Sequence, residues 1–401
     1  MNNFEPSSVT PAVPPSVTPA APPSVTPAVP STVTPAVPPS VTPAVPPPVI
    51  LSASEESYPS CHSHKNPLFV SLVVVAYNEE HCLPLILADI FAQDYPHPAI
   101  ELLLIDSNAG NNPKQRQLME EAAALDHDFR RIVILDNPAG YLPHGCNIAL
   151  TAYEGDVFLR VDAHSRIPAD FVRRCVEVLE EGHDVCGGFR PVVLKDPSAW
   201  REALLAAETS AFGASPASYR RSQQGSEVPS VFHGAYRRRV LDTVGGYDED
   251  LLRTEDNDMS QRIRAKGFRI WMDPRIYSQQ YLRPTLRALL KQKHANGYWI
   301  GRTLWIKPKA ISLIHLVPCA FVLALFGGVA LGITFNWLPL LALCGVYLLA
   351  DLALSFAAVF TAENPRLTLL ALPLIFPAMH VCYGTGTLAG IFSGLARRIF
   401  K

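Results

Sequence analysis

The last quarter of this 401-residue chain is almost free of charge. Between residues 310 and 395 only Asp351, Glu363 and Arg366 carry formal charge. An apolar helix of about 20 residues is long enough to cross the ~30 Å hydrocarbon core of a bilayer. Residues 310–401 are therefore predicted to be a membrane region, with hydrophobic segments near 311–333, 337–360 and 367–393.

The third hydrophobic segment is less regular than the first two, because prolines and glycines interrupt it. It either crosses the membrane or is broken or re-entrant, so the number of crossings stays open. Lys307 and Lys309 predict an integral protein of the cell membrane whose preceding domain lies on the cytoplasmic side. Three crossings would then carry Arg397 and Arg398 to the far side, against the positive-inside tendency.

Residues 285–309, directly before the membrane region, mix apolar and basic side chains. Trp299 and Trp305 lie among lysines and arginines, a composition typical of the headgroup zone of a membrane. This stretch is predicted to be a basic amphipathic interfacial segment. A second basic run, Arg237 to Arg239, is either a solvated helix face or a contact for a lipid-linked diphosphate.

Residues 65–284 alternate between short apolar runs and polar stretches with the pattern of helices. The apolar runs, rich in β-branched residues, are 68–77, 99–107, 131–136 and 156–163. Uninterrupted apolar strands separated by helices indicate a parallel sheet covered by helices on both faces. The predicted fold class is therefore α/β, with a mostly parallel, Rossmann-like sheet.

Two later stretches are also predicted to be helical. Residues 199–213 form a helix that is expected to end at Gly213. Residues 254–270 form another, with Thr254 as its N-cap and Gly267 as its terminator. Acidic residues fill the first turn of this second helix: Glu255, Asp256 and Asp258.

Polar side chains follow three of the four predicted strands. Tyr77 and Glu79 follow the first strand, Asp106 ends the second, and Asp162 and His164 end the fourth. Because ligands of such sheets bind beyond the carboxyl ends of the strands, we expect these side chains to share one edge. There a tyrosine can stack on a base, and Asp106 can accept hydrogen bonds from a uracil ring or from ribose hydroxyls.

Asp162 and His164 stand two residues apart, so they point to the same face of a strand. Together they can hold a divalent cation that neutralises a diphosphate, and the histidine favours Mn²⁺ over Mg²⁺. Taken singly, Asp106 could be a helix cap and His164 a hydrogen-bonded turn residue. Their occurrence at successive strand ends favours a binding site.

Asp256 is the candidate general base. At a helix N-terminus the dipole favours the ionised carboxylate and predicts a low pKa. Such a base accepts a proton late, once bonding to an electrophilic carbon is under way. The alternative is that Glu255, Asp256 and Asp258 do no more than complement the helix dipole.

The first 64 residues are predicted to be a disordered tail. Val-Thr-Pro-Ala recurs every eight residues from residue 9 to residue 41, and proline at this density excludes helix and sheet pairing. The tail is either a tether or a docking site for a partner that recognises proline motifs. A net charge of −2 gives no reason to expect nucleic acid as a partner. Eight scattered cysteines without a CxxC pair argue against a disulfide framework.

In their order along the chain, these motifs resemble family-2 glycosyltransferases, most closely the membrane-associated succinoglycan-biosynthesis type. The matching stretches are "VVVAYNEE", "LLIDSNAGN", "LRVDAH" and "VGGYDEDLLRTEDNDMSQRIRAKG". The resemblance covers about residues 68–305 and the membrane tail. It implies a GT-A fold, a nucleotide-sugar donor, a divalent metal and inversion at the anomeric carbon.

The resemblance also implies roles for individual residues. Tyr77 and Asp106 are similar to the base and ribose contacts of the family. Asp162, which also meets the donor, corresponds to the first acid of the DxD metal motif, and His164 stands in place of the second. Asp256, in a literal Thr-Glu-Asp with Glu255 before it, corresponds to the base that deprotonates the acceptor hydroxyl.

Departures from the family pattern narrow the expected function. Cys146 stands where an arginine commonly precedes a helix asparagine, which removes one diphosphate contact. The Gln-x-x-Arg-Trp motif of processive members is interrupted after Gln292, which favours addition of one sugar over long-chain polymerisation. Glu79 follows the family's Tyr-Asn-Glu and is expected to support the nucleotide loop of the donor site.

The chain is thus expected to be an inverting, metal-dependent hexosyltransferase that moves a sugar from a UDP-type donor. The expected acceptor is lipid-linked or membrane-embedded, in a cell-surface polysaccharide or glycolipid pathway. A nucleotidyltransferase would need a Gly-rich, basic phosphate loop after the first strand, which "YNEEHCLP" lacks. A non-catalytic membrane scaffold is the other alternative, although decay should have removed Asp162 or Asp256.

Overall fold

The computed structural model describes residues 66–108, 110–125, 127–210, 212–213, 224–361 and 367–399. The predicted tail over residues 1–64 lies outside these ranges, and so does the docking or tether role expected for it.

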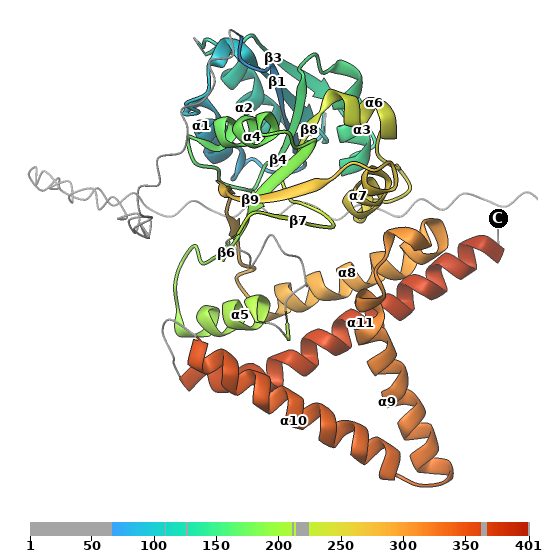
Figure 1. Cartoon of the computed structure of the whole chain (residues 1–401). Helices are drawn as coiled ribbons and strands as arrows, with labels where there is room; N and C mark the ends of the chain where they lie inside the picture. Colours follow the sequence, from blue (N-terminus) through green and yellow to red (C-terminus); the bar gives the residue numbers. More distant parts are fainter. Residues whose placement is uncertain are drawn as a thin grey trace, which may run out of the picture. The chain divides into compact units, whose positions relative to one another are not determined.

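A mixed eight-stranded sheet forms the centre of the domain that precedes the membrane region (Figure 1). Its strand order is β3-β2-β1-β4-β8-β5-β9-β7, in which β3, β2, β1 and β4 run parallel. β8 is antiparallel to both β4 and β5. The strands are β1 (Val70–Ala76), β2 (Ile100–Asp106), β3 (Arg131–Asp136), β4 (Val157–Asp162), β5 (Val185–Phe189), β7 (Ser226–Glu227), β8 (Ala235–Arg237) and β9 (Ile270–Tyr277).

The four predicted apolar runs become β1 to β4, so the mostly parallel α/β sheet is confirmed. A separate pair, β6 (Val192–Val193) and β10 (Gln280–Tyr281), runs parallel outside this sheet. β10 is followed after a short connection by the interfacial helix, so this pair lies where the α/β domain meets the membrane region.

Helices cover both faces of the sheet because β1 and its neighbours are apolar on both sides. Leu72 and Val74 pack into one core with α1, α2 and α4, whereas Val73 packs into a second core with α3, α6 and α7. Each fully buried side chain of this size contributes roughly 1.5–3 kcal/mol. These helices are α1 (Leu83–Phe91), α2 (Pro113–Ala124), α3 (Leu142–Ala152), α4 (Phe171–Glu180), α6 (Arg238–Val244) and α7 (Glu255–Ala265), with a short 3-10 turn, η1 (His97–Ala99).

Helix α5 (Ala199–Thr209) ends earlier than predicted. The chain leaves the helix at Ser210, whose hydroxyl accepts the backbone N–H of Gly213 at 3.1 Å. Serine competes with the helix in this way because its side chain can bond nearby backbone groups. The prediction that Gly213 ends the helix is therefore wrong.

Helix α7 begins directly after Thr254, as predicted, and Gly267 follows its C-cap with a φ of +87°. Thr254 does not cap the helix with its side chain. Its hydroxyl lies 2.6 Å from the hydroxyl of Thr303, on the interfacial helix α8 (Leu286–Ile306). The residue predicted as a local cap therefore makes a long-range contact.

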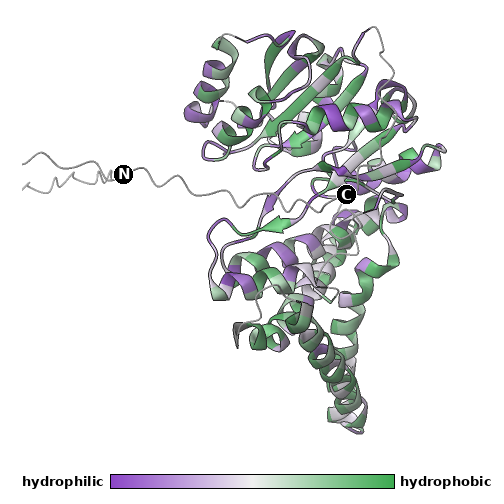
Figure 2. Ribbon diagram, turned by 60° about the vertical axis from the view of Figure 1, so that its left-hand side comes forward, coloured by the Kyte–Doolittle hydropathy of each residue, from purple (hydrophilic) through white to green (hydrophobic). Residues whose placement is uncertain are grey.

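Three helices of the described membrane region are long and apolar enough to cross a bilayer. The spans are Leu313–Thr334, Leu338–Phe360 and Leu369–Ile399. Figure 2 colours these helices largely hydrophobic, in contrast to the mixed α/β domain. The long helices are α9 (Val317–Thr334), α10 (Leu338–Thr361) and α11 (Leu372–Ile399). Short 3-10 turns precede them: η3 (Pro308–Ala310) and η4 (Leu313–Leu316) before α9, and η5 (Leu367–Ala371) before α11.

The third hydrophobic segment is one continuous helix, although Pro377 lies inside it. Its glycines do not break the helix but form a seam with α8, which lies beside α11 (Figure 1). A Cβ on Gly301 of α8 would overlap the carbonyl oxygen of Thr387, and a Cβ on Gly390 of α11 would overlap that of Tyr298. Small residues let helix backbones approach closely, which is a common device in membranes.

Side-chain hydrogen bonds extend the glycine seam to the ends of both helices. The indole N–H of Trp305 donates to the carbonyl of Ile391 at 2.9 Å, and the hydroxyls of Tyr298 and Ser393 lie 2.9 Å apart. The guanidinium of Arg398 lies 5.8 Å from the centre of the Trp305 ring. The C-terminal end of α11 therefore lies beside the C-terminal end of α8.

We expect Gly301→Leu to separate α8 from α11, because the added side chain has no room beside Thr387. Overpacking of this kind costs about 1–3 kcal/mol. Thermal unfolding in detergent should show a clearly lower midpoint for this variant. Gly345→Leu on α10 is the matched control, since a Cβ there meets nothing within 4 Å, and equal midpoints for the two variants would contradict the seam.

Candidate active site

Three parallel strands end side by side at the carboxyl edge of the sheet. Their register pairs Ala76 of β1 with Asp106 of β2, and Val75 of β1 with Asp162 of β4. Residues that follow these strands emerge at the same edge, where α/β sheets bind ligands. The structure thus brings together the three polar clusters that the sequence placed at strand ends.

Tyr77 and Asp106 differ in how much of each side chain is available to a ligand. Tyr77 is 54% exposed, so its ring is free to stack on a base. Asp106 is fully buried, and its Oδ1 accepts from Gln115 Nε2 at 2.7 Å and from the N–H of Asn108 at 3.2 Å. Asp106 Oδ2 has no hydrogen-bond partner among the described residues, although Arg116 lies 3.9 Å away. Any ligand contact of Asp106 must use this second oxygen.

Gln115 of α2 organises this corner of the site from a fully buried position. Its Nε2 donates to Asp106 and to the carbonyl of Ala76 at 3.2 Å, and its Oε1 accepts the N–H of Glu79 at 2.9 Å. One side chain thereby holds the ends of β1 and β2 in a fixed relation. Sequence analysis missed it, because a lone glutamine in a helix has no pattern that marks it.

His164 is paired with Glu79 as well as being near Asp162. Its Nδ1 lies 3.4 Å from Glu79 Oε1, and this hydrogen bond raises the pKa of His164 above its ordinary value. Burial tends to raise the pKa of Asp162, but the charge of Arg160, supported by His164 and Arg190, outweighs it, so this pKa lies below its ordinary value. Asp162 is therefore ionised. Glu79 contacts only the Nδ1 of His164 and leaves the Nε2 of this ring without a bond to that carboxylate.

A buried arginine joins the end of β4 to the start of α7. Arg160 is 8% exposed, and its Nη2 lies 3.6 Å from Asp162 Oδ1 while its Nη1 lies 3.7 Å from Glu255 Oε1. Sequence analysis missed this residue although a signal existed. A charge within an otherwise apolar strand, two residues before Asp162, must share the face of Asp162 and needs a buried partner.

Glu255 and Asp256 at the start of α7 hold their protons more tightly than ordinary carboxyl groups. Burial raises the pKa of Glu255 to about 8, and the neighbouring charge of Asp256 adds to this effect. Burial also raises the pKa of Asp256, against the opposing influence of Arg160 and of backbone N–H groups. The prediction of a low pKa for Asp256 is therefore wrong, because loss of solvent outweighs the helix dipole.

His233 supports the turn that carries Asp162 and His164. It is buried, it has a φ of +48°, and its Nε2 accepts the backbone N–H of Asp162 at 3.2 Å. The same nitrogen lies 3.2 Å from the hydroxyl of Ser165. Burial keeps the pKa of His233 well below its ordinary value, so the ring is neutral and Nε2 remains an acceptor.

The candidate acids lie where the α/β domain meets the membrane region. Thr254, directly before Glu255, is bonded to Thr303 of α8. His315 of η4, at the start of the first hydrophobic span, lies close enough to Asp256 for their charges to interact. The start of α7 therefore lies beside the segments that lead into the hydrophobic helices.

The basic run at residues 237–239 is largely used within the fold. Arg237 donates to two backbone carbonyls, and Arg238 donates to the carbonyl of Gly155 at 2.8 Å. Arg239 is 65% exposed and pairs with Asp184. Only Arg239 fits the predicted solvated face, and the contacts of the other two hold α6 to the domain.

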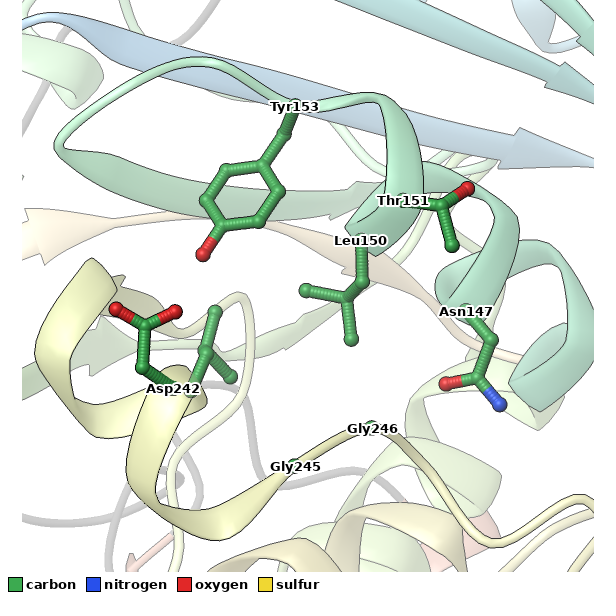
Figure 3. Close-up of a pocket in the computed structure, with 8 residues that line it drawn as sticks. Asn147, Leu150, Thr151, Tyr153, Asp242, Gly245 and Gly246 are labelled. Atoms are coloured by element: carbon green, nitrogen blue, oxygen red, sulfur yellow. The ribbon is translucent and has the colours of Figure 1, made fainter.

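A separate pocket of ≈ 270 Å³ lies between α3 and α6 (Figure 3). Leu150 and Tyr153 contribute its apolar wall, and Asn147 and Asp242 lie at its rim. None of the residues predicted for the site lines it. The candidate active site is therefore the strand-end cluster and not this pocket.

The α/β domain matches a known family over most of its length. Residues 71–245 match the family model described as Glycosyl transferase family 2. The succinoglycan biosynthesis protein ExoA of Rhizobium meliloti (strain 1021) is 28% identical over 289 residues, which cover 71% of this chain and 84% of that protein.

The names of two further relatives, both transferases, include a lipid phosphate. A dolichyl N-acetyl-alpha-D-glucosaminyl phosphate 3-beta-D-2,3-diacetamido-2,3-dideoxy-beta-D-glucuronosyltransferase of Methanococcus voltae is 21% identical, covering 81% of this chain and 98% of that protein. An undecaprenyl-phosphate 4-deoxy-4-formamido-L-arabinose transferase of Yersinia pestis is 35% identical over 123 residues, 30% of this chain and 36% of that protein.

Among solved structures, the mannosyltransferase PcManGT from Pyrobaculum calidifontis, in complex with GDP-Man and Mn²⁺, is similar at 18% identity. Its TM-score is 0.49, and the match covers 83% of this chain and 88% of that chain.

The sheet is mostly parallel, with the antiparallel β8 beside β4 and with acidic side chains at its carboxyl edge. Residues 71–245 are therefore a glycosyltransferase family 2 domain, and over 71% of its length the chain is similar to a succinoglycan biosynthesis protein, the type that its motifs resemble. This match favours a glycosyltransferase over the alternative of a nucleotidyltransferase.

We expect Glu255→Gln to make the protein relatively more stable as pH rises. A carboxyl group whose pKa is raised on folding stabilises the fold below its unfolded pKa, and this contribution is lost as pH approaches about 8. Glutamine cannot ionise, so the variant escapes this loss. Melting midpoints measured from pH 5.5 to pH 9 should show the difference, variant minus wild type, increasing with pH, and a constant difference would contradict the raised pKa.

Proposed function

We propose that this glycosyltransferase inverts the anomeric carbon of its donor sugar and works at the cytoplasmic face of a cell membrane. The donor is a UDP-type nucleotide sugar, and the acceptor is lipid-linked or membrane-embedded, in cell-surface polysaccharide or glycolipid synthesis. The observation that carries this proposal is the position of Asp256, two residues after Thr254, whose hydroxyl contacts Thr303 of the interfacial helix. The candidate base thus lies close in the chain to a contact with the helix that precedes the hydrophobic spans, from which a lipid-borne acceptor is proposed to arrive.

The relatives support a lipid-linked acceptor for this chain. The names of two of them specify a dolichyl-linked glucosaminyl phosphate and undecaprenyl phosphate. Lys307, which pairs with Asp248 at 3.4 Å, and Lys309 support the cytoplasmic orientation through the positive-inside tendency. The match to the relative from Methanococcus voltae covers 98% of that protein and 81% of this chain, so the membrane region is part of what the two share.

The donor is proposed to bind across the ends of β1, β2 and β4. Tyr77 stacks on the base, Asp106 Oδ2 accepts from the base or the ribose, and Glu79 supports the nucleotide loop through its bonds to Gln115 and His164. Asp162 lies closest to where the diphosphate is expected. The role of Tyr77 agrees with its exposure, and that of Asp106 with a buried Oδ2 that has no hydrogen-bond partner among the described residues.

The residues present fit a divalent cation, with Mn²⁺ favoured over Mg²⁺. Glu79 holds the Nδ1 side of His164, and metal-bound histidines usually have their other ring nitrogen oriented by such a partner. No group of three or more His, Cys, Asp or Glu side chains that could hold a metal ion is found in the described chain, so Asp162 and His164 are the two side chains that would hold it. When bound, the ion would neutralise the diphosphate as it leaves.

The proposed reaction is a single displacement. The acceptor oxygen forms a bond to the anomeric carbon while the bond from that carbon to the diphosphate oxygen breaks, and the diphosphate leaves with the electron pair. The proton of the acceptor hydroxyl goes to the carboxylate of Asp256, whose raised pKa improves it as a base. Arg160 keeps Glu255 and Asp162 in place on either side of the reacting centre.

Asp256→Asn should abolish transfer while the donor still binds, because the amide cannot accept the proton. A general base contributes about 10²- to 10⁴-fold to the rate. Nucleotide release in the presence of acceptor lipid should therefore fall by about 100-fold or more. Asp250→Asn, which changes an exposed acid in the preceding loop, is the matched control. Near-full turnover by the Asp256 variant would show that another group is the base.

His164→Ala should weaken Mn²⁺ binding measured in the presence of UDP, because one of two protein ligands is lost. Glu79→Gln should weaken it about 10- to 100-fold, the usual effect of losing an orienting partner. The EPR signal of free Mn²⁺ gives the affinity directly, without a turnover assay. His81→Ala is the control, since His81 is an exposed histidine nearby. Unchanged affinity in His164→Ala would remove the metal role of this residue.

A further inference from the structure

A short pair of strands leads two helices, and not one, out of the α/β domain. β6 and β10 run parallel, and β6 is followed after a short connection by α5, as β10 is by α8. Both helices begin after a hydroxyl residue whose side chain accepts a backbone N–H, Ser198 from Arg201 and Thr285 from Ala288. α5 therefore leaves the domain in the same way as the interfacial helix, although residues 65–284 were predicted to form one α/β domain.

One face of α5 packs against the membrane region. Ala203, Leu204 and Ala207 are fully buried in a core that also contains Leu289 of α8 and Phe376 of α11. α5 lies beside the start of α11 (Figure 1). It is thus attached to helices that are apolar enough to enter a bilayer.

An ion pair fixes the C-terminal end of α5 to α8. Lys293 Nζ lies 2.7 Å from Glu208 Oε2, and it donates to the carbonyl of Gly213 at 3.2 Å. Both side chains of the pair are buried, where an ion pair is costly to break. α5 and α8 therefore keep a fixed relation, so a headgroup layer that contains α8 reaches α5 as well.

Trp200 continues the buried stripe of α5 toward the start of the helix. It precedes Ala203, Leu204 and Ala207 by three, four and seven residues, a spacing that puts side chains on one face of a helix. Trp200 is nevertheless 42% exposed, whereas the other three residues are fully buried. An exposed indole in line with a buried apolar stripe leaves a further apolar contact to be made.

The side chains at this end of the membrane region favour lipid as that contact. Leu370 of η5 and Leu374 of α11 are 68% and 78% exposed. η5 contacts α5 directly, and both leucines belong to the third candidate span, where exposed apolar side chains face acyl chains. Tryptophan is enriched where hydrocarbon meets headgroups, because its ring is apolar and its N–H is polar.

We propose that α5 is a second interfacial helix and that Trp200 inserts into the headgroup layer of the bilayer. The α/β domain is then attached to the membrane surface through two helices, one that follows β6 and one that follows β10. This role goes beyond the proposed reaction, because it depends neither on the sugar nor on the acceptor.

The test uses the full-length protein in phosphatidylcholine vesicles whose acyl chains carry bromine close to the headgroup. Bromine quenches tryptophan fluorescence only at short range, and the chain has five tryptophans, so Trp200 is measured by difference. Trp200→Phe should remove an emission that this lipid quenches, and the quenched fraction of the remaining fluorescence should fall. Bromine near the ends of the acyl chains should quench the Trp200 emission less.

Trp271→Phe is the matched control. Trp271 lies at the start of β9, stacked on His183 with 4.4 Å between the ring centres, and β9 leads from there toward β10 and α8. Its removal should raise the quenched fraction, because an emission that lipid does not reach is lost. Trp200→Tyr, which keeps a polar aromatic ring, replaces the phenylalanine variant if that variant does not fold.

Two outcomes would overturn the inference. A Trp200 emission that is quenched by acrylamide in the water but not by brominated lipid shows that α5 faces solvent. A Trp200 emission that is protected from both quenchers shows that protein, such as a second copy of the chain, covers this face. Because the fluorescence reports lipid contact without turnover, failure of the proposed function would be a separate result.

Discussion

The architecture of the site depends on one buried positive charge. Arg160 comes from the middle of β4, where solvent cannot reach it, and an isolated charge there would be strongly destabilising. Its two acidic partners belong to different elements, Asp162 at the end of its own strand and Glu255 at the start of α7. The need to compensate this charge ties the metal motif to the catalytic helix, although about 90 residues of chain separate them.

The same charge explains the protonation states of the site. Asp162 stays ionised because the charge of Arg160, the largest of the influences that lower its pKa, opposes the effect of burial. Glu255 shares Arg160 but lies deeper and next to Asp256, so burial and a like charge raise its pKa. Two carboxyl groups on one guanidinium thus have opposite tendencies. Such a difference is useful in a site that must bind a cation and also accept a proton from an alcohol. The first task needs a carboxylate that stays ionised, and the second needs one with a higher pKa.

Much of the fold could be predicted because the apolar runs and the parallel topology are local signals. The runs at 68–77 and 156–163 became neighbouring strands, and the parallel arrangement then required Asp106 and Asp162 to share an edge. Gln115 and His233 could not be found in this way, because their roles depend on contacts with residues far along the chain.

Corrected expectations have a common physical origin in tertiary contacts. Thr254 was expected to cap its own helix, but a partner on α8 takes its hydroxyl. A low pKa was expected for Asp256 because of the helix dipole alone. Burial of this carboxyl group raises the pKa instead. The glycines of α11 were interpreted as interruptions, whereas they are the residues that let α8 approach.

The contact between Arg398 and Trp305 has a topological consequence. If α8 lies in the headgroup layer, a group 5.8 Å from Trp305 cannot sit beyond a hydrocarbon core of ~30 Å. Arg397 and Arg398 then belong to the same leaflet as Lys307 and Lys309. Two crossings, one by α9 and one by α10, are enough to return the chain to that leaflet. The basic residues at the end of the chain then no longer conflict with the positive-inside tendency.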